Sequence, residues 1–252
     1  MSNKINLLIL SFALRPVAGK SHFGSSNCLP YFCVMNSLTE ENYLKALFSL
    51  ADDKGEVGVN ELSKRLEIKM PTVNSMMKKL AEKKLVHYES YKPLRLTEKG
   101  RKEAGLIIRK HRLTEMFLVE KMGFGWEEVH EIAEQIEHIQ SAAFFDKMDV
   151  LLGYPKVDPH GSPIPDKSGK LVWRNYQKLS NCKVGDTITL AAVIESSTEF
   201  LTYLNGRELR LGIKIKIKAI EPFDGSMTVS YGKNTSVVLS STVTERLLGE
   251  ML

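Results

Sequence analysis

The spacing of apolar residues changes once along this chain of 252 residues, near residue 178. Before that point, in segments such as 39–51, apolar side chains return every three or four positions, which is the period of an α-helix. Beyond it, in segments such as 187–194 and 210–220, they alternate or run together, and β-branched residues are frequent. We therefore expect a mainly helical protein with a small β part, in which five or six strands form a barrel of about 75 residues.

Residues 59–96 have the pattern of a winged helix-turn-helix. A helix over 39–51, capped by Thr39, and a turn over 52–57 are expected to precede it. Residues 59–67 predict a short helix, and Pro71 opens a second helix at a first-turn position that suits proline. Two short strands follow around a turn near Lys92–Pro93 and would form the wing. In such a motif the second helix lies in the major groove of DNA.

The charge of this region favours a nucleic-acid partner, although the whole chain carries only +5. Between Lys64 and Lys102, twelve Lys and Arg residues stand against four acidic ones. Residues early in the second helix are expected to face base edges, and basic residues around it to contact phosphates. The first set is Lys69, Pro71, Thr72, Asn74 and Ser75; the second is Lys78, Lys79, Lys92 and Arg95, with Lys83 and Lys84 beside them. The plain alternative is a pair of helices with a solvated lysine face.

An acidic block with histidines follows the basic one. His130, Glu134, Glu137 and His138 stand at i, i+4, i+7 and i+8 of a helix expected over 126–152, so they would share one face. His111 and Glu115 are again four residues apart on the preceding helix, which Gly123 and Gly125 would end. Imidazole and carboxylate donors without thiolate favour Mn²⁺, Fe²⁺ or Zn²⁺ over Cu(I). The remaining histidines, His22, His87 and His160, lack such neighbours and are interpreted as surface or structural residues.

Several classes of protein are disfavoured by the same sequence. No His-Glu-x-x-His run or substrate pocket is recognisable, so we expect no enzyme. No stretch reaches the roughly 20 apolar residues of a membrane-spanning helix. The three cysteines match neither a zinc pattern nor a disulfide framework, which favours a reduced, cytoplasmic setting.

Several passages resemble the diphtheria-toxin-repressor family of iron- and manganese-dependent transcriptional regulators, over about residues 38–252. The most specific are RKHRLTEMFL, VHEIAEQIEHIQS and DPHGSPIPD, beside TEENYLKALF, MPTVNSMMKKLAEKKLV and LTEKGRKEA. The resemblance implies a homodimer held by helices after the wing, with two metal sites per subunit. It also implies that the C-terminal barrel is SH3-like, similar to the small domain of ferrous-iron transport accessory proteins.

The resemblance also distributes the ligands over two sites. His111, Glu115 and His130 match the ancillary site; Glu134, Glu137 and His138 match the primary, activating site, together with Asn42 of the first helix. Glu134 stands where iron-type members have Cys, and its harder oxygen favours Mn²⁺, with Fe²⁺ as the alternative. Lys45 stands where manganese-type members have Glu, so the resemblance does not extend to a closely spaced pair of Mn²⁺ ions. Around Ala191–Ile194 the barrel is apolar, and we expect no ligand from it.

Four segments are expected. Residues 1–34 are a disordered extension or a misassigned start ahead of Met35; the alternative is an export signal, because Lys4 precedes an apolar run. Residues 35–107 form the winged helix-turn-helix domain, 108–176 the metal-binding and dimerisation domain with an ordered coil and linker at its end, and 177–252 the SH3-like domain.

The expected function is a metal-dependent repressor that binds double-stranded operator DNA as a dimer and controls metal-uptake genes, without a membrane or a small-molecule substrate as partner. One alternative is a metal-buffering or metal-transport accessory protein whose working part is the barrel. Another is a helix-turn-helix regulator of a small organic effector, which would have an apolar pocket and would bind DNA in the presence of a chelator.

Overall fold

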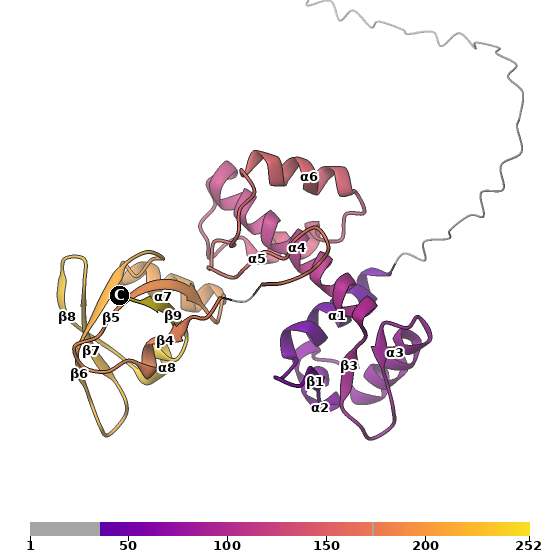
Figure 1. Ribbon diagram of the computed structural model, residues 1–252, viewed down its shortest axis with the longest axis horizontal. Helices are drawn as coiled ribbons and strands as arrows, with labels where there is room; N and C mark the ends of the chain where they lie inside the picture. The colour runs from indigo at the N-terminus through magenta and orange to yellow at the C-terminus, as the bar shows by residue number, and fades with distance from the viewer. Residues whose placement is uncertain (1–35, 173) are drawn as a thin grey trace, which may run out of the picture. The chain divides into compact units, whose positions relative to one another are not determined.

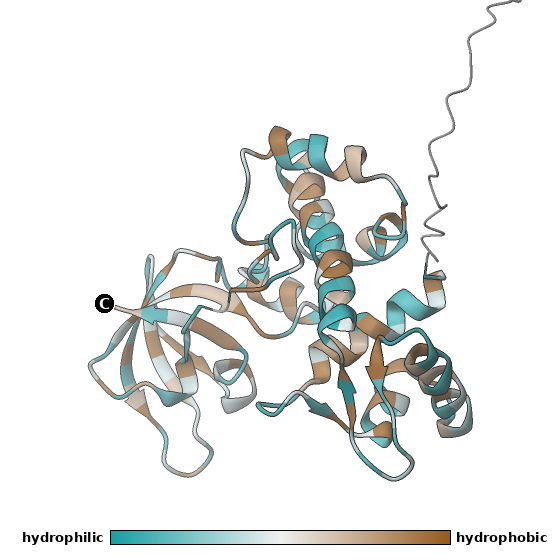
Figure 2. Cartoon of the chain, turned by 45° about the vertical axis from the view of Figure 1, so that its right-hand side comes forward, coloured by the Kyte–Doolittle hydropathy of each residue, from teal (hydrophilic) through white to brown (hydrophobic). Residues whose placement is uncertain are grey.

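The computed structural model describes residues 36–172 and 174–252 (Figure 1). The expectations for residues 1–34 concern a segment outside these ranges. Hydrophobic and hydrophilic positions are interleaved along the helices and strands, as their periodicity predicted (Figure 2). Among the described residues, no helix combines the length and the apolar character needed to cross a bilayer.

The N-terminal part is a winged helix-turn-helix, as predicted. Its helices are α1 (Leu38–Leu50), α2 (Val59–Leu66) and α3 (Met70–Glu82), with Pro71 in the first turn of α3. Strands β1 (Glu56–Val57), β2 (Val86–His87) and β3 (Leu94–Leu96) form an antiparallel sheet in the order β1-β3-β2. The segment expected to be only a turn, 52–57, therefore also supplies an edge strand to the wing. Apolar side chains from all three helices and the sheet share one core.

The first helix begins at Leu38 and is capped by Ser37, so the prediction that Thr39 caps it is wrong. The Ser37 hydroxyl accepts a hydrogen bond from the Glu40 amide, and the Glu40 carboxylate accepts one from the Ser37 amide. This reciprocal pair satisfies two of the amides that a helix start leaves without partners. Lys79 of α3 and Lys83, the residue that follows this helix, also contact Glu40, at 3.2 and 2.7 Å, so the cap of α1 is joined to the second helix of the motif.

Removing the charge of Glu40 is expected to destabilise this domain. Burial raises the pKa of Glu40, but contacts with Lys83, the Ser37 amide and Lys79 outweigh burial and lower the pKa to about 2. The charged form is therefore favoured by folding, and its stabilisation is lost as the pH falls from about 4.5 towards 2. Glu40→Gln should lower the free energy of unfolding by about 1–3 kcal/mol at pH 7, and by little near pH 2. Urea unfolding of the full chain at several pH values measures this, with the exposed Glu82→Gln as control; equal loss at all pH values would contradict the ion-pair account.

The middle part consists of α4 (Glu98–Met122), α5 (His130–Ile136) and α6 (Ala142–Leu151). Gly123 ends α4 with a positive φ of 77°, as expected. The prediction of one helix over 126–152 is wrong. The chain leaves helical geometry after Glu137, and Ser141 has an extended backbone and accepts a hydrogen bond from the Phe144 amide, so it caps a new helix.

The proline-containing coil after α6 is ordered against α4. The side chains of Arg109 and Arg112 donate hydrogen bonds to the carbonyl oxygens of Pro165 and Pro163. Gly105 of α4 has no room for a side chain, because a Cβ there would lie 1.9 Å from the Gly169 carbonyl oxygen. The coil is thereby held beside the same helix that carries His111 and Glu115.

The C-terminal part is a six-stranded antiparallel sheet in the order β4-β9-β5-β6-β7-β8, which confirms the expected strand number. Its strands are β4 (Gln177–Lys178), β5 (Thr187–Val193), β6 (Lys214–Ile220), β7 (Met227–Tyr231), β8 (Asn234–Leu239) and β9 (Leu247–Met251). The short helices are η1 (Leu179–Asn181), α7 (Thr198–Gly206) and α8 (Ser241–Thr244). The apolar residues of the strands and of α7 form a core of their own, which includes the buried Cys182.

Candidate metal centre and DNA-binding surface

Two helices bring the first predicted group together. His111 and Glu115 lie one turn apart on α4, and their Nε2 and Oε1 atoms are 3.0 Å apart. His130, at the start of α5, has its Nδ1 3.2 Å from His111 Nε2 and 3.3 Å from Glu115 Oε1. One donor atom from each residue lies within 4.8 Å of the other two, a spacing that allows one metal ion to contact all three.

A second group shares His111 with the first. The Nδ1 atom of His111 lies 2.5 Å from Glu137 Oε2 and 4.0 Å from Glu134 Oε1. Glu137 is fully buried, whereas Glu134 is partly exposed. The sequence placed His111 with the ancillary residues alone, but the structure places its two ring nitrogens toward both groups.

His138 lies beyond the end of α5, so it does not continue one helical face with His130. Its Nδ1 atom is 2.6 Å from Glu41 Oε2 of α1, and its Nε2 atom is 3.7 Å from Glu137 Oε1. A carboxylate on one ring nitrogen commonly orients a metal-binding histidine and leaves the other nitrogen as the donor. Glu41 is buried and was not singled out from the sequence, because a glutamate in the first turn of a helix ordinarily interacts with the helix dipole alone.

A third group, Glu115, Asp158 and His160, was missed. His160, expected to be a surface or structural residue without such neighbours, is buried and does have them: its Nδ1 atom lies 3.7 Å from Glu115 Oε2 and its Nε2 atom 2.9 Å from the Trp126 carbonyl oxygen. Asp158 is also buried and accepts hydrogen bonds from the amides of His160 and Ser162. Helical spacing could not reveal this group, because the DPHGSP turn reaches Glu115 only through tertiary packing.

The crowding of carboxylates and imidazoles shifts the pKa values of several groups. Burial lowers the pKa of His111, but its contacts with Glu115 and Glu137 outweigh this and raise the pKa to about 9. Burial alone would raise the pKa of Glu115, but contacts with His111, His130 and His160 bring it well below the usual range. Burial, followed by the charge of Glu115, raises the pKa of Asp158 to about 6. The raised pKa of His111 and the lowered pKa of Glu115 therefore favour a positively charged imidazole beside an anionic carboxylate.

The first helix contributes two charged side chains to the edge of this cluster. Glu41 contacts His138, and Lys45 Nζ lies 2.5 Å from Glu134 Oε1 and 2.8 Å from Glu137 Oε1. Asn42 lies between them on the helix, and its buried Oδ1 atom has no hydrogen-bond partner among the described residues. A buried hydrogen-bond acceptor without a partner lowers the stability of the folded protein. This oxygen is therefore suited to contact a bound group that the protein itself does not provide, such as a metal ion.

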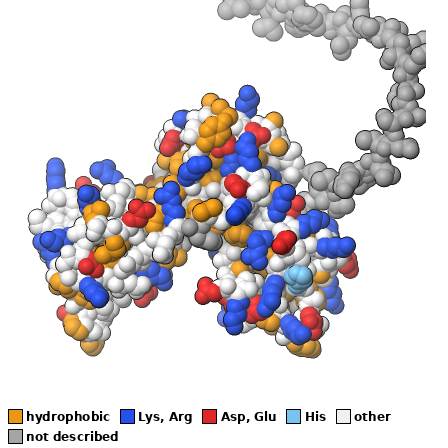
Figure 3. Space-filling model, viewed as in Figure 1, with side chains coloured by type: hydrophobic (Ala, Val, Ile, Leu, Met, Phe, Trp, Pro, Cys, Tyr) orange, Lys and Arg blue, Asp and Glu red, His pale blue; other side chains and the backbone are white. Residues whose placement is uncertain are grey.

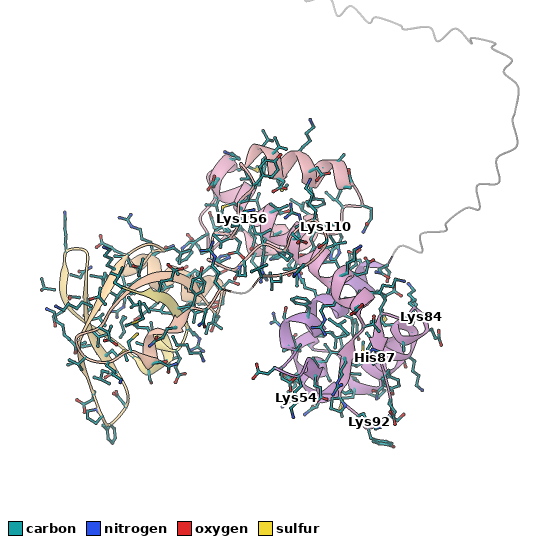
Figure 4. The ribbon with its side chains drawn as sticks, viewed as in Figure 1. Lys54, Lys84, His87, Lys92, Lys110 and Lys156 are labelled. Atoms are coloured by element: carbon teal, nitrogen blue, oxygen red, sulfur yellow. The ribbon has the colours of Figure 1, made fainter. Side chains whose placement is uncertain are left out.

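The DNA-binding residues predicted on α3 are accessible. Lys69, Pro71, Thr72 and Ser75 are exposed, and Asn74 is half-buried. Lys78 is exposed, whereas Lys79 contacts Glu40, Lys92 contacts Glu89, and Arg95 contacts Glu56. Lys54, Lys84, His87 and Lys92 all lie on the surface of this domain (Figure 4). Tyr91 is fully exposed in the wing turn, and it was not recognised from the sequence as a candidate contact.

The comparisons with known proteins agree with this architecture. Residues 35–94 match the iron-dependent repressor N-terminal DNA-binding domain, 97–166 its metal-binding and dimerisation domain, and 177–251 the FeoA domain. A solved manganese-dependent transcriptional repressor in complex with manganese is 31% identical with a TM-score of 0.77, covering 84% of this chain and 100% of that one. ScaR with bound Zn²⁺ is 31% identical with a TM-score of 0.71, covering 84% of this chain and 99% of that one.

Two curated relatives also match parts of this chain. The iron-dependent repressor IdeR of Mycobacterium tuberculosis H37Rv is 35% identical over 133 residues, which are 52% of this chain and 58% of IdeR. The transcriptional regulator MntR of Oceanobacillus iheyensis is 31% identical over 118 residues, which are 47% of this chain and 80% of MntR. The match therefore spans little more than half the length of IdeR. A winged helix-turn-helix followed by a helical His/carboxylate cluster and a small β domain defines a class of metal-dependent regulators, and this chain belongs to the iron-dependent repressor family.

Proposed function

We propose that this chain is a metal-activated transcriptional repressor that binds operator DNA as a homodimer when it holds Mn²⁺, with Fe²⁺ as the alternative metal. It would control metal-uptake genes, would be located in the cytoplasm, and would have no catalytic activity. One observation carries the proposal: α1 of the DNA-binding domain contacts the cluster directly, through Glu41 on His138 and Lys45 on Glu137. A change in the cluster therefore acts on the helix-turn-helix.

The donors fit a divalent transition metal. Glu134, Glu137 and His138 would hold the primary ion together with the unpaired oxygen of Asn42. His111, Glu115 and His130 would hold the ancillary ion, and we add Asp158 and His160 to that site because they meet Glu115. None of the groups found among the described residues contains a cysteine, and Cys182 is buried in the core of the C-terminal domain. Oxygen and imidazole donors favour Mn²⁺ or Fe²⁺ over softer metals.

The residues of the chain explain how such a site controls DNA binding. A bound divalent cation would neutralise the buried carboxylates and add a link between α1 and α5. Glu41 orients His138, and Asn42 presents its oxygen from α1, so the ligand set is complete only when α1 lies against α5. The position of α1 fixes that of α3, because the two helices share one core and the contacts of Glu40. In a two-fold dimer the position of α3 in each subunit sets the distance between the two α3 helices. This distance must match the separation of two DNA half-sites, which is about one helical turn or a multiple of it.

The outer face of α6 is the surface that we propose for the dimer. Phe144, Val150 and Leu151 are 42, 55 and 61% exposed, while Phe145 and Met148 of the same helix are buried against α4. Hydrophobic side chains also show on the surface where Figure 1 draws α6 (Figure 3). A group of exposed large apolar residues commonly marks a protein interface.

Asn42→Asp is expected to tighten Mn²⁺ binding roughly tenfold, because the charge of the ligand set strongly tunes the affinity for hard cations. Calorimetry on the full chain measures the change. The matched control is Ser49→Asp, which adds the same charge to an exposed position of α1 and should leave the affinity unaltered. Equal Mn²⁺ affinity in Asn42→Asp and the unaltered chain would remove Asn42 from the ligand set.

Gel-shift titration of genomic fragments with Mn²⁺, Fe²⁺ and Zn²⁺ under anaerobic conditions tests the function itself. We expect metal-dependent retardation of a specific fragment that a chelator reverses. Metal binding without retardation of any fragment would favour a metal-buffering or transport accessory protein instead. Retardation that a chelator leaves unaltered would favour a regulator of an organic effector.

A further inference from the structure

Lys45 places a positive charge inside the second group of candidate ligands. Its Nζ atom lies 2.5 Å from Glu134 Oε1, and 2.8 and 3.0 Å from the two carboxylate oxygens of Glu137. The side chain comes from α1, is 18% exposed, and reaches residues 89 and 92 positions further along the chain. A single ammonium group with three donors therefore contacts both carboxylates of the group at once.

The contact matters because Glu137 is fully buried. An ionised carboxylate removed from water is costly unless it is paired and hydrogen-bonded. Glu137 has two such partners, Lys45 Nζ on both oxygens and His111 Nδ1 at 2.5 Å from Oε2. Glu134 also faces Lys45, with His130 Nε2 at 3.6 Å from its Oε1 atom. The ammonium of Lys45 and the imidazole of His111 therefore occupy oxygen atoms that a metal ion would also use.

We propose that Lys45 is a tethered cation of the primary metal site, and that it sets the metal concentration at which the site fills. In the metal-free protein its ammonium group neutralises Glu134 and Glu137 and holds α1 against α5. A divalent ion must displace the ammonium from at least one carboxylate, so Lys45 lowers the affinity of the group. The ammonium of Lys45 also takes the place of a second divalent ion, so this group of ligands binds a single divalent ion. The inference rests on the proposed metal site, but it concerns metal binding and does not require that the chain binds DNA.

The chemistry of lysine suits this role. Its ammonium is a compact, strongly hydrated charge on a flexible chain of four carbons, so it can leave a carboxylate and remain solvated nearby. Lys45 already has partial access to solvent, in contrast to the fully buried Glu137. Asn42 and Glu41 lie on the same side of α1 and keep their positions when the ammonium moves, since neither depends on Lys45 for a hydrogen bond.

The experiment compares Mn²⁺ binding by the full-length chain with that of Lys45→Met and Lys45→Glu, using calorimetry and the electron spin resonance of free Mn²⁺. Lys45→Met keeps the length of the side chain without its charge and should bind Mn²⁺ roughly tenfold more tightly at this group. Lys45→Glu should bind one more Mn²⁺ per subunit. The exposed Lys54→Met, in the turn after α1, controls for the general loss of one positive charge.

Two results would overturn the proposal: an unaltered or weaker Mn²⁺ affinity in a folded Lys45→Met protein, or an unaltered stoichiometry in a folded Lys45→Glu protein. Circular dichroism decides whether each variant is folded. If Lys45→Met does not fold, Lys45→Gln, which keeps hydrogen-bond donors, replaces it in the same comparison. A gel shift on the same samples separates this proposal from the proposed function. Tighter Mn²⁺ binding without any DNA binding would support the role of Lys45 and count against the repressor.

Discussion

Replacing Glu137 by Gln is expected to abolish metal-dependent DNA binding. Glu137 is the fully buried carboxylate that meets His111, Lys45 and, at 3.7 Å, His138. Gln keeps the shape but provides one neutral oxygen donor in place of two charged ones. Loss of partners around a metal ligand already costs 10–100-fold in metal affinity, so loss of the ligand charge should cost roughly 100-fold or more. Mn²⁺ affinity by calorimetry and operator affinity by fluorescence anisotropy should fall together.

A matched control is available on the same helix. Glu131 of α5 is exposed, so Glu131→Gln removes the same charge without touching the cluster. It should leave both affinities close to those of the unaltered chain. A Glu137→Gln protein that retains its Mn²⁺ response would exclude Glu137 from the activating site. A large effect of Glu131→Gln would show that general charge, and not the cluster, governs the response.

The second large effect is expected from Leu151→Glu on the outer face of α6. Leu151 is 61% exposed, so the isolated subunit should tolerate the glutamate charge. An apolar dimer interface would have to bury two such charges, one from each subunit. The protein should become a monomer in light scattering. Two linked DNA-binding domains bind DNA more tightly than one by a factor of about 10²–10⁴, so the operator affinity of the monomer should fall by a similar factor.

The barrel provides the comparison for this variant. Val238 of β8 has a similar exposure of 59%, and Val238→Glu should leave the oligomeric state and the operator affinity unaltered. A Leu151→Glu protein that remains a dimer would refute the assignment of this surface. A Leu151→Glu monomer with unaltered Mn²⁺ affinity would show that the metal sites are complete within one subunit.

The sequence predicted those features that depend on neighbouring residues. The winged helix-turn-helix follows from local periodicity and from Pro71, which suits a first turn. His111 and Glu115 were paired correctly because a spacing of four residues on one helix fixes their distance. The candidate ligands Glu134 and Glu137 follow from a similar rule, since a spacing of three residues across the end of α5 also brings two side chains to one face.

Features that depend on tertiary packing could not be predicted in this way. The break after Glu137 depends on Ser141 as a new cap, and it turns His138 toward Glu41 of a different domain. Asp158 and His160 reach Glu115 because the coil packs on α4. Lys45 was noted from the family resemblance as a departure, but its contact with both carboxylates is visible only in the structure.

Linkage between metal and DNA is the central claim, and one measurement addresses it most directly: the Mn²⁺ affinity of the full chain with and without a saturating operator fragment. Because coupling between two binding sites is reciprocal, the operator should raise the Mn²⁺ affinity by the same factor by which Mn²⁺ raises the operator affinity, about 5–150-fold. An Mn²⁺ affinity that is the same with and without the operator would mean that the cluster beside α1 and the DNA-binding surface of α3 act independently, and it would contradict the proposed coupling.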